Sequence, residues 1–184
     1  VGVKHRHAGF KIDCDAYPYD TATNPLRNLL PRWVMEGGIP AMLERLRVRD
    51  VRTRIRDEIE RNGLTNFGRI ASWDAVRVAI SPHLPENAGR TLGDIARSRG
   101  LDPIDAVADY VVADRGETRI LVTSMTEADV REITRAPWVT VGSDGNALAV
   151  TGVTSQGKPH PRYYGTHAYV LGPCVRDLRL LTLE

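Results

Sequence analysis

The chain has 184 residues, of which 42% are hydrophobic, so it is long enough to bury a core as one large domain or two small ones. Its 25 basic and 23 acidic side chains are scattered along the sequence and leave a formal charge of only +2, which argues against a nucleic-acid-binding face. No stretch approaches the roughly 18 apolar residues of a membrane span, and the two cysteines form no CxxC pair, so we expect a cytoplasmic globular protein that binds neither nucleic acid nor membrane.

The first part of the chain is expected to form one strand followed by helices. In residues 9–20 apolar and polar side chains alternate, which predicts a strand on which Cys14 is buried. From Ile39 onward, apolar residues recur at helical spacing and predict an amphipathic helix. They continue on a second, arginine-rich helix that Asp50 is expected to cap.

In the rest of the chain, strands and helices are expected to alternate. The expected strands are residues 73–80, 120–124 and 138–141, and the expected helices begin after the N-caps Thr91, Asp102 and Thr126. A helix between two strands, as in residues 120–141, indicates a parallel α/β unit. A complete (β/α)8 barrel takes roughly 250 residues, and this chain has too few expected strands to close one.

The residues with the clearest chemical potential follow the last expected strand. Asp144 lies in a Gly-Ser-Asp-Gly turn at residues 142–145, where a carboxylate can bind a metal or move a proton. Downstream, Arg162 offers a planar fork for a substrate carboxylate, and His160 and Tyr17 complete the group by residue type. A plain turn and a surface ion pair explain the same residues, so spacing alone leaves both interpretations open.

A second candidate is the His-Arg-His run at residues 5–7. Two histidines that alternate on a strand point to one side and are a common zinc arrangement. This pair is flanked by basic residues and has no carboxylate ligand nearby in sequence, so we interpret it as a solvated basic terminus.

Several longer motifs resemble one family. They are residues 15–19 (Asp-Ala-Tyr-Pro-Tyr), 29–33 (Leu-Leu-Pro-Arg-Trp), 36–38 (Glu-Gly-Gly), 142–145 (Gly-Ser-Asp-Gly), 160–166 (His-Pro-Arg-Tyr-Tyr-Gly-Thr) and 170–172 (Val-Leu-Gly). Together and in this order they resemble the N-acyl-D-amino-acid deacylases, or D-aminoacylases, of the amidohydrolase superfamily. The resemblance runs from about Gly9 to Glu184. It implies a metal-dependent hydrolase of the amide bond of N-acyl-D-amino acids, which are small molecules with a free carboxylate.

The resemblance also implies a fold of the α/β class. The chain would be a partial (β/α)8 amidohydrolase barrel, containing its last strands, with a large, mainly helical α+β insertion. Residues 1–20 would hold the seventh barrel strand and residues 21–125 the insertion subdomain. Residues 126–184 would supply a barrel helix, the eighth strand and the C-terminal segment.

Site roles follow from the same resemblance, residue by residue. Asp144 would be the metal-associated aspartate that takes a proton from a zinc-bound water and passes it to the leaving amine. Tyr17 and Arg162 would hold the substrate's α-carboxylate, and Thr23 would assist as a small hydroxyl residue. His160, at the start of the His-Pro-Arg motif, is also expected to bind substrate.

The chain departs from the family in its metal ligands. The family's histidine pair, its bridging cysteine and its middle-strand histidines have no counterpart here. We therefore expect a fragment of a zinc deacylase that alone binds no catalytic zinc, hydrolyses nothing and associates with copies of itself through unpaired strand edges. The alternatives are a cyclic-amide hydrolase related to hydantoinases or dihydroorotases, and a non-catalytic helical interaction module.

Overall fold

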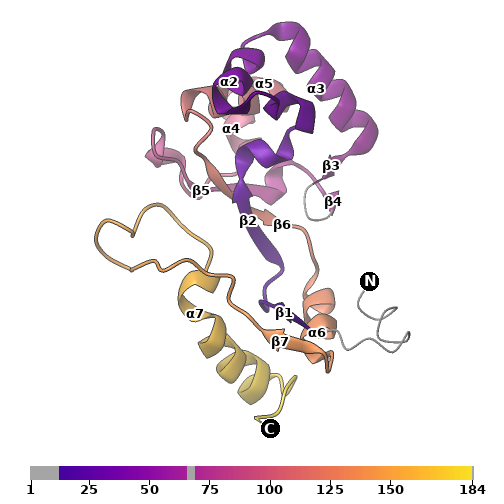
Figure 1. The fold of residues 1–184 in the computed structure, drawn as a ribbon, viewed down its shortest axis with the longest axis vertical. Coiled ribbons are helices and arrows are strands. Elements are labelled where there is room, and N and C mark those ends of the chain that lie inside the picture. The colour runs from indigo at the N-terminus through magenta and orange to yellow at the C-terminus, as the bar shows by residue number, and fades with distance from the viewer. Residues whose placement is uncertain (1–12, 66–68, 184) are drawn as a thin grey trace. The chain divides into compact units, whose positions relative to one another are not determined.

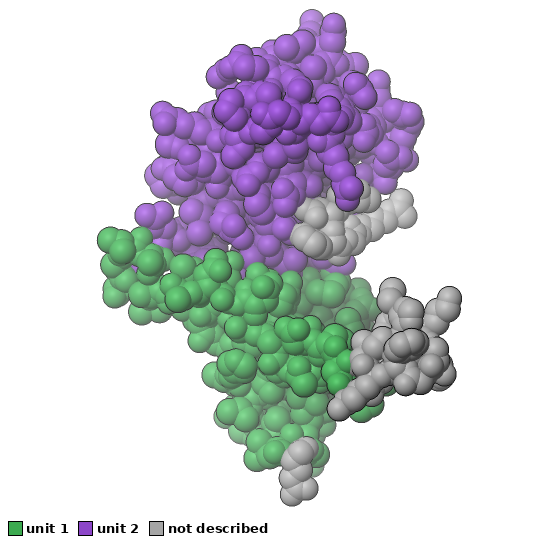
Figure 2. Space-filling view, viewed as in Figure 1, with its two compact units in different colours: residues 1–20, 125–154, 161–184 green, residues 21–124, 155–160 purple. Residues whose placement is uncertain are grey.

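A computed structural model describes residues 13–65 and 69–183, so the His-Arg-His run and the start of the first expected strand lie outside it. The chain divides into two compact units, which Figure 2 colours separately. Unit 1 comprises Val1–Asp20, Met125–Thr154 and Pro161–Glu184, and unit 2 comprises Thr21–Ser124 and Ser155–His160. Each unit is therefore assembled from segments that are distant in sequence.

Unit 2 contains a three-stranded antiparallel sheet with the strand order β2-β6-β5 (Figure 1). Its strands are β2 (Thr21–Pro25), β5 (Val76–Ile80) and β6 (Arg119–Thr123). The central strand places Leu121 opposite Thr23 on one side and Arg77 on the other. The parallel unit expected over residues 120–141 is therefore wrong, because β6 pairs with antiparallel neighbours in unit 2 whereas the next strand belongs to unit 1.

Four α-helices gather at one side of this sheet (Figure 1). They are α2 (Gly38–Leu46), α3 (Arg49–Asn62), α4 (Leu92–Arg99) and α5 (Pro103–Ala113). Short 3-10 turns η1 (Leu26–Leu29), η2 (Arg32–Met35), η3 (Trp73–Ala75) and η4 (Pro85–Asn87) and a small hairpin of β3 (Leu64–Thr65) and β4 (Arg69–Ile70) complete the unit. The apolar sides of sheet and helices form one core, which includes Met42, Leu46, Ile55, Val78, Ile95, Val107, Ile120 and Val122.

Side-chain caps explain where two of these helices, α4 and α5, begin. The Thr91 hydroxyl accepts a hydrogen bond from the Asp94 N–H at 3.0 Å, and the Asp102 carboxylate accepts one from the Ile104 N–H at 2.9 Å, as expected. The cap expected at Asp50 is wrong. Helix α3 begins two residues earlier than that cap implies, with Val48 at the N-cap, so Asp50 lies within the first turn.

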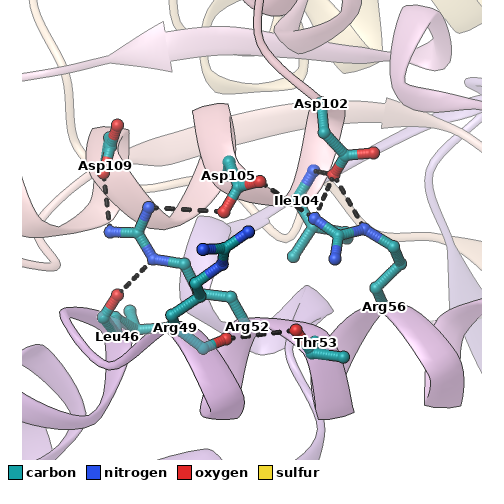
Figure 3. Close-up of polar contacts among 9 residues, drawn as sticks. All are labelled: Leu46, Arg49, Arg52, Thr53, Arg56, Asp102, Ile104, Asp105 and Asp109. Atoms are coloured by element: carbon teal, nitrogen blue, oxygen red, sulfur yellow. Dashed lines mark hydrogen bonds and ion pairs between the residues drawn. The ribbon is translucent and has the colours of Figure 1, made fainter.

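Ion pairs link α3 to α5 and its N-cap (Figure 3). Among the residues of α3, only Ile55 is classed as buried. Arg52 reaches Asp109 at 2.6 Å and Asp105 at 3.4 Å. Arg56 bridges Asp102 and Asp105, both at 2.9 Å. The two arginines therefore form ion pairs with three carboxylates along one side of α5 and its N-cap.

Unit 1 contains a short parallel pair of strands, β1 (Cys14–Ala16) and β7 (Val139–Val141). Helix α6 (Glu127–Arg135) begins with a complete capping box between Thr126 and Asp129, which confirms the N-cap expected at Thr126. Near the C-terminus, α7 (Arg162–Tyr169) continues directly into η5, a π-helical segment over Val170–Asp177. No helix in the described part of the chain has the length and apolar character to cross a membrane.

The burial expected for Cys14 is wrong. Its side chain is exposed and lines an open groove together with Asp129 and Glu132 of α6. Alternation along a strand shows which residues share a face, but whether another element covers that face depends on tertiary packing.

Candidate active site

The carboxyl ends of β1 and β7 lie side by side in unit 1. The pairing register sets Ala16 opposite Val141, and the Gly142 N–H donates to the Ala16 carbonyl at 3.2 Å. Tyr17 follows one strand directly and Asp144 follows the other after two residues. In α/β folds with parallel strands, ligands bind at this end because the loops that follow the strands converge there.

Asp144 presents an exposed carboxylate at this strand end. Its backbone φ of +45° lies in the left-handed region, which side chains other than glycine seldom adopt and which aspartate tolerates better than most. Asp144 Oδ2 forms an ion pair with Arg162 Nη2 at 2.8 Å. Its side chain nevertheless remains 68% exposed, so the carboxylate keeps most of its hydration.

Arg162, the first residue of α7, is buried, with only 7% of its side chain exposed. Its guanidinium carbon lies 4.6 Å from the centre of the Tyr17 ring and 5.4 Å from that of Tyr163, distances at which a cation is attracted to an aromatic face. The sequence motif contained Tyr163, but spacing could not show that its ring meets the guanidinium. The two rings hold a buried cation next to Asp144.

A cavity of about 270 Å³ opens beside these strand ends. It is lined by Asp15, Ala16, Tyr17, Tyr19, Met125, Val130, Ile133 and Asp144. Two carboxylates therefore share a cavity whose other walls are mostly apolar or aromatic. Such a cavity suits a small organic molecule whose polar group meets Asp144 and whose remaining surface is apolar.

Asp15 is a cavity residue to which the sequence assigned no role in the site. It pairs with Thr140 across the parallel strands, and its carboxylate lies against Gly142. The signal that points to it is its position as the second residue before Tyr17 on the same strand end. Residues at the carboxyl ends of parallel strands are natural site residues.

The two other residues expected in the site, Thr23 and His160, belong to unit 2. Thr23 is buried on β2, opposite Leu121. His160 is 1% exposed, and its Nε2 atom lies 2.7 Å from the Thr21 carbonyl oxygen. Tyr17, Asp144 and Arg162 are thus brought together in unit 1, while the substrate contacts expected of Thr23 and His160 stay predictions.

The described residues do not by themselves form a metal centre. Within residues 13–65 and 69–183, no three or more histidine, cysteine or acidic side chains are grouped closely enough to hold an ion. Asp144 is one potential oxygen ligand and Asp15 lines the same cavity. A zinc site usually needs three or four protein ligands, so these two carboxylates do not complete one.

Comparison with known proteins connects this geometry to a family. No family model matches the chain. It is 34% identical over 111 residues to the N-acyl-D-glutamate deacylase of Alcaligenes xylosoxydans xylosoxydans, a stretch that covers 60% of this chain and 20% of that protein. It is 39% identical over 107 residues to the N-acyl-D-aspartate deacylase of the same organism. This stretch covers 58% of this chain and 19% of that protein. The resemblance to the N-acyl-D-amino-acid deacylases is confirmed.

A solved deacylase structure supports the same conclusion. The N-acyl-D-glutamate deacylase from Bordetella bronchiseptica, complexed with zinc and a phosphonate inhibitor that mimics the tetrahedral intermediate, matches with a TM-score of 0.61 and 25% identity. The match covers 98% of this chain and 27% of that one. The chain spans about a fifth of the length of the curated deacylases that it matches. The likeness therefore concerns one segment of these hydrolases of carbon–nitrogen bonds.

Proposed function

We propose that this chain is one segment of a metal-dependent amidohydrolase that hydrolyses the amide bond of N-acyl-D-amino acids. The observation that carries the proposal is the pairing of buried Arg162 with exposed Asp144 beside the ends of two parallel strands. The sequence similarity to deacylases supports the reaction type and the D configuration of the substrate. In the complete enzyme, β1 and β7 would be the last two strands of the barrel.

Arg162 would bind the α-carboxylate of the substrate. A guanidinium donates two parallel N–H groups to a carboxylate and keeps its charge when buried. Tyr17 would hold the plane of this guanidinium through its ring face, which lies 4.6 Å away. A substrate without a carboxylate would make no charged hydrogen bond to Arg162, so the site would bind N-acyl-amino acids more tightly than simple amides.

Asp144 would move the proton during hydrolysis. Its carboxylate is exposed at the strand end, where it can accept a proton from the attacking water and deliver it to the departing amine nitrogen. The amide carbon–nitrogen bond then breaks without a covalent bond to the protein. The products would be a carboxylic acid and a D-amino acid.

Zinc belongs to this proposal through the Bordetella relative, whose structure contains it. Asp144 would be one ligand, and the remaining ligands would come from outside the described residues, because those residues contain no cluster that completes a site. We therefore propose that the chain alone neither holds catalytic zinc nor hydrolyses substrate. Thr23 and His160 would serve as further substrate contacts in the complete enzyme.

The test is a chimera in which this chain replaces the matching segment of the Bordetella deacylase. We expect it to hydrolyse N-acyl-D-amino acids. Arg162→Gln should lower kcat/KM by about 100-fold, mainly through KM, because substrate binding loses a charged hydrogen-bond partner. Asp144→Asn should lower kcat by about 1000-fold, because proton transfer is lost.

Arg176→Gln is the matched control, because Arg176 is exposed and pairs with the adjacent Asp177. Its kinetics should equal those of the parent chimera. A chimera that folds and hydrolyses hydantoin or dihydroorotate in preference to N-acyl-D-amino acids contradicts the proposal and favours a cyclic-amide hydrolase. A folded chimera that hydrolyses neither contradicts both and favours a non-catalytic module.

A further inference from the structure

The two residues with the clearest proposed roles neutralise each other in this structure. Asp144 Oδ2 lies 2.8 Å from Arg162 Nη2, within hydrogen-bond distance. In the proposed function, however, Arg162 binds the carboxylate of the substrate and Asp144 acts on the amide. Both tasks require the ion pair between them to open.

The burial of the two partners shows which one can leave. Arg162 is 7% exposed and its guanidinium lies against the rings of Tyr17 and Tyr163, so this cation is fixed and depends on an anion nearby. Asp144 is 68% exposed and returns to water at little cost. Because so little of Arg162 is accessible, a second carboxylate that reaches the guanidinium competes with Asp144 for the same N–H groups.

We propose that Arg162 exchanges partners when substrate binds. In the metal-free chain without ligand, Asp144 neutralises its guanidinium; the carboxylate of an N-acyl-amino acid then takes that place and releases the Asp144 side chain to act on the amide. This inference rests on the proposed function and adds a regulatory step to it. The substrate carboxylate that Arg162 recognises is also the group that releases the base, Asp144. Amides that lack the carboxylate leave Asp144 bound to Arg162.

The exchange predicts that removing the charge of Asp144 strengthens ligand binding. The probe is N-acetyl-D-alanine, titrated calorimetrically into the metal-free chain, with N-acetyl-D-alaninamide as the ligand without a carboxylate. Asp144→Asn should bind the acid about fivefold more tightly than the unaltered chain, since the competing ion pair is gone. The amide should gain nothing, and Arg162→Gln should abolish binding of the acid.

Asp177→Asn is the matched control. Asp177 carries the same charge and also forms an ion pair with an arginine, but its partner Arg176 is exposed and has no proposed role in the site. This variant should change the affinity by less than about twofold. As an independent measurement on the unaltered chain, the side-chain carboxyl carbon resonance of Asp144 should shift when the acid is added and stay constant with the amide.

Three results would overturn the exchange. An equal gain in Asp177→Asn would show a general effect of removing a negative charge. Unchanged or weaker binding in Asp144→Asn, with binding still lost in Arg162→Gln, would refute the exchange and leave the proposed function standing. Binding that is absent throughout, or indifferent to Arg162→Gln, would refute both the exchange and the carboxylate-binding role of Arg162.

Discussion

The carboxylate of Asp15 occupies the space that a side chain at Gly142 would need. A Cβ built on Gly142 would lie 3.1 Å from both Cβ and Cγ of Asp15, which is tighter than nine in ten real Cβ contacts, and closer still to one carboxylate oxygen. Glycine at the end of β7 therefore allows the Asp15 side chain to lie across the strand end next to Asp144. The position of the Asp15 carboxylate in the cavity therefore depends on the absence of a side chain at Gly142.

Replacing Gly142 by alanine should therefore destabilise the chain through Asp15. We expect Gly142→Ala to lower the free energy of unfolding by about 1 kcal/mol in urea denaturation, because an extra methyl group must displace the Asp15 side chain. In an Asp15→Ala background the same change should cost much less. An equal cost in both backgrounds would show that Asp15 is not the obstacle.

Gly165→Ala is the control for this change. Gly165 lies inside α7, and a Cβ built there meets nothing within 4 Å. Alanine loses less backbone entropy than glycine when it enters a helix, so this variant should raise the free energy of unfolding by about 0.5–1 kcal/mol.

The ion-pair network between α3 and α5 should make unit 2 sensitive to acid. Burial opposes the ionisation of Asp102, but hydrogen bonds from Arg56 and from the Ile104 N–H outweigh it, so the pKa of Asp102 lies below its ordinary value of 3.8. Because this pKa is lower in the folded chain than in the unfolded one, its contribution to stability is complete above the unfolded value and disappears as the pH falls through the folded value.

Asp102→Asn keeps a capping oxygen but removes the charge. It should lower the free energy of unfolding by about 0.5 kcal/mol at neutral pH, and the difference from the unaltered chain should vanish near pH 2. Urea denaturation across this range measures both. Glu60→Gln, an exposed position of α3 outside the network, is the control. A loss of unfolding free energy in Asp102→Asn that does not depend on pH would contradict a stabilising role for the Asp102 charge.

A buried carboxylate in unit 2 holds a loop in place. Asp114 is 0% exposed and accepts hydrogen bonds from the His83 N–H at 2.8 Å and from the Thr118 hydroxyl. Asp114→Ala leaves the buried Thr118 hydroxyl and the His83 N–H without their acceptor, so it should cost about 2–3 kcal/mol of unfolding free energy. Asp114→Asn retains an acceptor and should cost about half as much. Glu117→Ala, at an exposed neighbour, should change little, and a similar loss there would refute the explanation.

Unit 1 exposes large apolar side chains, which favour association of the chain with copies of itself. Ile133, Leu171 and Leu178 are 41%, 59% and 41% exposed. Light scattering after gel filtration should show a molar mass that rises with protein concentration. Leu171→Ser combined with Leu178→Ser should reduce the rise. The control is Val48→Ser with Leu101→Ser, two exposed apolar positions of unit 2. A monomeric mass at every concentration would contradict this expectation.

The starts of three helices could be predicted from the sequence because they depend on local hydrogen bonds. The caps at Thr91, Asp102 and Thr126 each join a side chain to a backbone N–H two or three residues further on, so chain connectivity alone brings the partners together. Helix α7 was not predicted, because the glycines in this part of the chain weaken the helical signal. In the structure, burial of Thr166 in α7 and of Cys174 in η5 stabilises the helical conformation.

For the candidate site, the sequence by itself predicted which side chains would carry the chemistry. It named Tyr17, Asp144 and Arg162 because their types suit a carboxylate-bearing substrate and because the motifs around them are specific. Only the tertiary structure decided that Arg162 is buried, that it pairs with Asp144, and that β6 pairs with antiparallel strands instead of with β7. The physical reason is that pairing and burial depend on contacts between residues far apart in the chain, and residue order alone does not specify those contacts.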